Sequence, residues 1–411
     1  MATISGTQFA NRLIADLAPL ASVDRESGRV SFSAGGQFDE QRMLLFDLVQ
    51  FGGQIPNEDA MAIARDAMFA AAATSPGLTL DRFVGEVTRL EREYLSRRPS
   101  RHVFLTQISI DAKAILPRML QDGVTISFPP SVPKRFLETR QQVLDHAARS
   151  LYVDPPKRYR WLRASVSAKS FIAAGDSALE AIEFRVALLN LGANRQTGIR
   201  WSSGKRTPVN SIALAPLHTL HRPSGALSSE TWWYEPNYVA PLDLESRKVT
   251  SAIEFSESAI SRLRRLPYAG DFKDWVRYYG RALGESDWAV SFILLWQALE
   301  SATGTSRAKY ESTVRRASFL FDDVEYSKQV LDSLRNCRNE IVHAQNDPTG
   351  LETRLYMLKR YVEAVLVFHL RHASDFDTVD EAGQFLDLPA STKELGKRLR
   401  LIEKAANFRG L

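Results

Sequence analysis

From about residue 246 to the C-terminus, apolar side chains recur at three- and four-residue steps in successive segments that short breaks separate. This spacing puts them on one face of each helix, and helices joined by short loops pack as an antiparallel bundle. The expected helices span roughly residues 250–266, 274–283, 288–299, 310–321, 327–344 and 351–372. The sequence therefore predicts an all-α antiparallel bundle over residues 246–411.

Residues 102–245 have a different character, with short runs of β-branched and aromatic side chains that end at turn or proline signals. The expected strands are residues 103–108, 124–128, 159–166, 198–201 and 211–214. Ser177 and Glu180 form a capping-box pattern, so a helix is expected to open there and to stop at Gly192. This middle region is predicted to be α+β, with a regulatory or sensory role.

Residues 1–101 are predicted to be mostly helical, with helices near residues 9–20, 43–49, 60–73 and 83–95. The last of these runs into a basic stretch at residues 97–101, for which a solvated linker is favoured over an RNA-contacting patch. The aromatic, proline-punctuated stretch at residues 232–241 is interpreted as a packed connection between domains rather than a base-stacking surface.

Composition places the chain among ordinary soluble proteins, since 44% of its residues are hydrophobic and 25% are charged. No uninterrupted apolar run is long enough for a transmembrane helix, and the N-terminus lacks the pattern of a secretory signal. The single cysteine, Cys337, excludes an intrachain disulfide and a multi-cysteine zinc site. A cytoplasmic protein without membrane contact is expected, and its net charge of +5 is compatible with an RNA partner.

Residues 334–343 combine two arginines, two asparagines, an acid and a histidine in an otherwise apolar helical segment. Leu331, Leu334, Cys337 and Ile341 would form its buried face. Polar side chains so close to a core are costly unless each finds a partner, and a working site would supply such partners.

The stretch from Arg338 to His343 resembles the R-φ-x3-H motif of the HEPN superfamily, with Asn339 at the polar φ position. The element Ala298-Leu299-Glu300 on the preceding helix is similar to the "ALE" element of the Apea-like branch. The resemblance covers roughly the last 160 residues and implies an antiparallel helical fold. It also implies that Arg338 and His343 are the catalytic pair, that Asn339 orients the substrate or the histidine, and that Glu300 holds Arg338 or Arg335.

Such a pair suits RNA cleavage without a metal cofactor. Histidine exchanges protons near neutral pH, and arginine stays charged and matches phosphate oxygens. Arg335 and Asn336 are candidate RNA-binding residues, although Arg335 could instead pair with Asp332. The plainer alternative makes Arg338 a surface charge and His343 a helix-terminal residue that the helix dipole favours.

Arg338 and His343 are five positions apart, which puts them about 140° apart around an ideal helix. A two-fold axis that pools two copies of the helix in one cleft would bring them together, as would a distortion near Ala344. HEPN nucleases generally work as dimers, so a homodimer through the C-terminal helical domain is expected.

The resemblance predicts a metal-independent endoribonuclease that leaves 2′,3′-cyclic phosphate ends and cuts tRNA or other cellular RNA. It implies a prokaryotic anti-phage defence or toxin role, in which the N-terminal region senses a phage- or host-derived trigger or partner protein. The alternatives are a HEPN module that binds RNA or dimerises without cutting, and a subunit of a larger defence complex.

Other histidine pairs compete weakly for a functional role. His218 and His221 fall in a segment predicted to be a loop, with no acid or cysteine beside them, and are expected to be structural or surface residues. His369 and His372 near a helix end are attributed to the helix dipole.

Overall fold

The computed structural model describes residues 2–24, 29–33, 36–75, 77–110, 114–151, 159–195, 207–235, 238–241, 245–305, 310–343 and 348–410. It forms two compact units. The first comprises Met1–Phe104, Ser165–Ala178 and Leu220–Ser229, and the second comprises Leu105–Ala164, Leu179–Thr219 and Glu230–Leu411. Within the described ranges, no helix is both long and apolar enough to cross a membrane.

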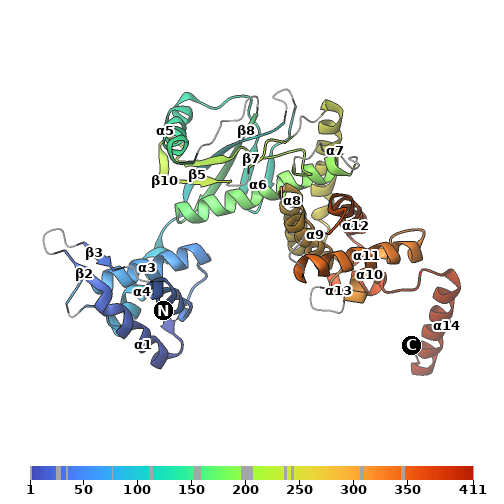
Figure 1. Cartoon of the computed structure of the whole chain (residues 1–411), viewed down its shortest axis with the longest axis horizontal. Coiled ribbons are helices and arrows are strands. Elements are labelled where there is room, and N and C mark those ends of the chain that lie inside the picture. The colour runs from blue at the N-terminus through green and yellow to red at the C-terminus, as the bar shows by residue number, and fades with distance from the viewer. Residues whose placement is uncertain are drawn as a thin grey trace. The chain divides into compact units, whose positions relative to one another are not determined.

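The N-terminal part of the first unit is mostly helical, as predicted (Figure 1). Its helices are α1 (Thr7–Leu17), the 3₁₀ helix η1 (Ala18–Leu20), α2 (Gly36–Asp47), α3 (Asn57–Ala72) and α4 (Leu80–Ser96). Two small antiparallel pairs accompany them: β1 (Thr3–Ile4) with β4 (Val49–Gln50), and β2 (Ala21–Val23) with β3 (Val30–Phe32).

These helices share one apolar core, because each presents apolar side chains to the others. Phe46 and Phe83 stack there with ring centroids 6.5 Å apart. Inside the same unit, Tyr94 donates a 2.6 Å hydrogen bond to the buried carboxylate of Asp59, which ties α4 to α3. Burial raises the pKa of Tyr94, so its hydroxyl remains a donor.

A six-stranded sheet follows, with strand order β10-β9-β5-β8-β7-β6. Its strands are β5 (Ser100–Ile108), β6 (Met119–Gln121), β7 (Val124–Ser127), β8 (Arg160–Ala168), β9 (Leu217–His221) and β10 (Leu227–Tyr234). The strands predicted at residues 103–108, 124–128 and 159–166 are confirmed. The prediction at residues 211–214 is wrong, since only an isolated bridge from Leu214 to Ile108 forms there, and residues 198–201 lie outside the described residues.

Two strands of this sheet differ from the sequence-based expectation. The proline and glycine after β9 led to the prediction of a loop around His218 and His221. In the structure they only end the strand, which includes both histidines. β10 takes in the aromatic residues up to Tyr234, for which a connection between domains is predicted. In β9 every residue is buried, so the alternation that would reveal a half-exposed strand is absent.

Helices α5 (Lys134–Leu151) and α6 (Phe171–Asn194) belong to the same region of the sequence. Buried Arg140 fastens α5 to the sheet, donating to the carbonyl oxygens of Leu105 and Leu217 and to the hydroxyl of Thr219. α6 begins earlier than predicted, and its first turn is capped by Ser170, which accepts from the backbone N–H of Ala173. The predicted capping box at Ser177 is therefore wrong, and this pair lies inside the helix.

Among the described residues from 245 onward, all the regular secondary structure is helical, as predicted (Figure 1). The helices are α7 (Ser246–Leu263), α8 (Ala269–Gly284), α9 (Trp288–Ala302), α10 (Tyr310–Ser318), α11 (Val324–His343), α12 (Leu351–Arg371), α13 (Val379–Leu386) and α14 (Thr392–Arg409). α9 packs against α8 and α12 and buries Phe292, Leu295 and Trp296 completely or almost so. α14 has no buried residue.

Candidate active site

Helix α11 carries the motif residues, and its own sequence explains why it forms. Asp323 precedes the helix and accepts a 2.9 Å hydrogen bond from the backbone N–H of Tyr326, which satisfies one of the free donors of the first turn. Leu331, Leu334 and Cys337 are buried, as predicted, and Ile341 is half-buried. This apolar stripe holds α11 against the other helices and fixes which way its polar residues face.

Arg338 and Asn339 lie half-buried beside that stripe. The guanidinium Nη1 of Arg338 donates to Oδ1 of Asn339 across 3.3 Å. The amide oxygen thus helps to orient the cation without neutralising it, because asparagine carries no charge. The guanidinium has a planar set of donors that matches the oxygens of a phosphate group.

Arg335 and Asn336, the predicted RNA-binding residues, precede the motif by one turn. Arg335 forms an ion pair with Asp332 at 3.1 Å, which is the second of the two roles considered for it. Both partners retain solvent exposure, so the pair is weak and a polyanion could compete for the arginine. Asn336 is exposed.

His343 is the last residue of α11 and is exposed to solvent. The helix stays α-helical up to this position, so Arg338 and His343 remain about 140° apart around its axis and about 7.5 Å apart along it. Within one copy of α11 the two side chains therefore point in different directions. The alternative of a distorted end at Ala344 falls outside the described residues.

Glu300, on α9, is half-buried, and its carboxylate Oε1 accepts a 2.8 Å hydrogen bond from Nε1 of Trp296. Trp296 lies one turn earlier on the same helix and is almost fully buried, so it anchors the acid. The backbone carbonyl of Glu300 accepts a 2.8 Å hydrogen bond from the N–H of Thr305, which closes the end of α9. The acid is thus positioned by its own helix, whereas Arg335 takes Asp332 as its partner.

Arg354 is a further candidate residue of this site, and the sequence analysis did not single it out. It lies in the first turns of α12, half-buried beside Cys337 of α11. Burial raises the pKa of the Cys337 thiol, and the charge of Arg354 partly opposes that rise. Only the packing of α12 on α11 brings this second cation to the motif helix.

Three other histidines, His218, His221 and His369, have structural partners. His218 and His221 are fully buried on β9 rather than in a loop; Nδ1 of His218 lies 2.7 Å from the hydroxyl of Thr106, and Nδ1 of His221 lies 3.2 Å from the carbonyl of Gly225. His369 is also buried, which lowers its pKa to about 4, so it is neutral and the proposed stabilisation by the helix dipole does not apply. Among the described residues, no group of three or more histidine, cysteine or acidic side chains could hold a metal ion.

Comparison with known proteins adds no relative. No family model matches this chain, and no curated protein and no solved structure matches it significantly. A functional assignment therefore depends on the arrangement of α9, α11 and α12 and on the residues that these helices carry.

Proposed function

We propose that this chain is a metal-independent endoribonuclease of HEPN type, with Arg338 and His343 as its catalytic pair. One observation carries the proposal: α11 keeps its apolar face buried while it presents an oriented guanidinium and, at its end, an exposed imidazole. Imidazole is the side-chain group best suited to general acid and base catalysis near neutral pH.

The proposed reaction needs no external reagent other than RNA. The 2′-hydroxyl loses its proton to a base, and its oxygen attacks the adjacent phosphorus. The bond from phosphorus to the 5′-oxygen breaks, and that oxygen takes up a proton. The products are a 2′,3′-cyclic phosphate and a 5′-hydroxyl. His343 serves the proton transfers, and Arg338 stabilises the negative charge of the crowded phosphorane.

The opposed directions of Arg338 and His343 support a homodimer. In a symmetric pair, Arg338 of one copy can face His343 of the other, so that the cleft holds two of each. Val342, half of whose surface is exposed beside His343, offers an apolar contact for such a pairing. Loss of the dimer would then remove activity even with both residues intact.

The biological setting comes from the resemblance of the motif. We propose a prokaryotic anti-phage or toxin effector that cleaves tRNA or other cellular RNA, with residues 1–245 as a region that senses a trigger or partner protein. The competing assignment is a helical module that binds RNA or dimerises without cutting, alone or in a larger complex.

The deciding experiment incubates the full chain with total cellular RNA in excess EDTA, beside its His343→Ala and Arg338→Ala variants. We expect cleavage by the parent alone, with 2′,3′-cyclic phosphate ends. His372→Ala is the matched control for the histidine, because His372 also lies at a helix C-terminus and is partly exposed. Lys328→Ala, which removes a partly exposed cation on α11, is the control for the arginine.

Cleavage that survives in both motif variants would overturn the nuclease assignment to these residues. RNA binding without cleavage by the parent, in the presence of a cell extract that supplies a trigger, would favour the non-catalytic module. Sedimentation of the same samples shows whether each variant keeps the oligomeric state of the parent.

A further inference from the structure

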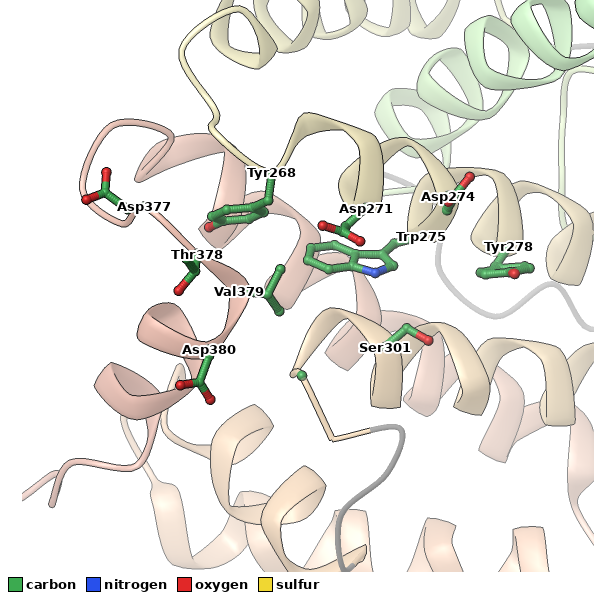
Figure 2. Close-up of a pocket in the computed structure, with 11 residues that line it drawn as sticks. Tyr268, Asp271, Asp274, Trp275, Tyr278, Ser301, Asp377, Thr378, Val379 and Asp380 are labelled. Carbon is green, nitrogen blue, oxygen red and sulfur yellow. The ribbon is translucent and has the colours of Figure 1, made fainter. Parts of the chain in front are cut away.

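A cavity of about 740 Å³ lies among the helices of the second unit, and none of the motif residues lines it. It is formed by α8, the end of α9 and the start of α13 (Figure 2). Its volume falls in the range of small-molecule sites. Its lining combines aromatic rings with carboxylates, and none of its described lining residues is basic.

The aromatic side of the cavity consists of Tyr268, Trp275 and Tyr278. Behind the first two lies His369, whose ring centroid is 4.9 Å from that of Trp275 and which stands almost perpendicular to Tyr268. Nε2 of His369 lies 2.8 Å from the carbonyl of Ala302 and must donate to it, so Nδ1 accepts the 2.9 Å hydrogen bond from the hydroxyl of Tyr268. The rings are thus fixed in place by a neutral histidine that adds no positive charge.

The lining also has four aspartates: Asp271 and Asp274 from α8, Asp377 just before α13 and Asp380 in its first turn. Asp271 and Asp380 lie in first turns, where a carboxylate also suits the helix dipole. That explanation does not extend to Asp274, which is exposed and has Arg277 only at 3.6 Å.

The order of these groups along the cavity indicates the kind of ligand. In Figure 2, Tyr268, Trp275 and Val379 lie between Asp377 and Asp380 on one side and Asp274 on the other. Cationic groups are attracted to carboxylates and to aromatic faces, and methylene stems pack on the rings between them. A single compact cation would reach only one end of this arrangement, whereas an elongated one would reach both.

We propose that this cavity is a binding site for a linear aliphatic polyamine. Its ammonium groups would lie against the aspartates at the two ends, and its methylene chain would cross the small exposed parts of the Trp275 and Tyr268 rings. This site is separate from the proposed nuclease site, and the two proposals can fail independently.

The test titrates spermine into the full chain, freed of nucleic acid, and follows heat and tryptophan fluorescence. We expect saturable binding of one spermine per chain, and at least tenfold weaker binding for the double variant Asp377→Asn, Asp380→Asn. Asp145→Asn is the matched control, because Asp145 accepts from a glutamine four residues away just as Asp380 does. Tyr278→Ala, which removes a partly exposed ring and should leave the fold intact, is expected to weaken binding as well.

Three outcomes would overturn the assignment. One is that the double variant binds spermine as tightly as the Asp145→Asn control does. Another is displacement of spermine by an equal concentration of Mg²⁺, which would indicate a nonspecific charge effect. The third is that a tetra-arginine peptide binds more tightly than spermine and that the same substitutions weaken its binding, which would make the cavity a peptide site.

Discussion

Trp296 donates its indole N–H to the carboxylate of Glu300 across 2.8 Å, within one turn of α9. This contact gives the acid a fixed position next to the helix that bears the motif, since α9 and α11 pack against each other. It also separates two properties of Glu300 that a substitution can distinguish: its ability to accept from Trp296 and its negative charge.

Glu300→Gln keeps an acceptor for Trp296 and removes only the charge. We expect the free energy of unfolding to change by less than about 1 kcal/mol. RNA cleavage should fall by at least about tenfold if the charge helps to position an arginine across the site. Urea unfolding and a cleavage assay check the two parts, and unchanged cleavage would remove Glu300 from the proposed site.

Arg338→Lys keeps a positive charge beside Asn339 but loses the planar pair of donors that matches two phosphate oxygens. We expect cleavage to fall by roughly one to two orders of magnitude, with RNA binding weakened much less, because the lost contacts act mainly on the transition state. Single-turnover rates and filter-binding affinities separate these effects. A lysine variant as fast as the parent would show that a point charge is sufficient.

Gly280 allows α8 to approach α6 closely, since a Cβ at this position would lie 2.6 Å from Cβ of Ala187. Gly280→Ala is expected to destabilise the fold by about 1–3 kcal/mol through overpacking. Gly270→Ala, on the same helix, meets nothing within 4 Å and should be neutral or stabilising by up to about 1 kcal/mol. Thermal unfolding of the two variants tests the pair, and equal melting temperatures would contradict the close approach.

The buried His369 predicts a pH dependence of stability. Burial lowers its pKa from 6.5 to about 4, so the unfolded chain binds a proton more readily than the folded one between these values. Its contribution is full above pH 6.5 and is lost as the pH falls toward 4, by up to roughly 3 kcal/mol. His369→Gln cannot titrate, so its free energy of unfolding should fall less steeply between pH 7 and 5. Parallel slopes for parent and variant would contradict this linkage.

The periodicity of apolar side chains was sufficient to predict most of the local elements. The helical character of residues 246–372, the strands at 103–108, 124–128 and 159–166, and the buried stripe of α11 all follow from this spacing. Spacing specifies which residues share a face, because helix and strand geometry are the same in every protein. The position of Arg338 beside that stripe follows for the same reason.

The meeting of groups from distant segments depended on tertiary packing. Every residue of β9 is buried, so its sequence shows no alternation of polar and apolar residues. Only its pairing with neighbouring strands in the structure identifies it as a strand. Arg354 reaches Cys337 only because α12 packs on α11. Likewise, Trp275 and Asp380 are far apart in the sequence and line one cavity. Such contacts depend on how whole helices pack, and side-chain spacing within one segment carries no record of that packing.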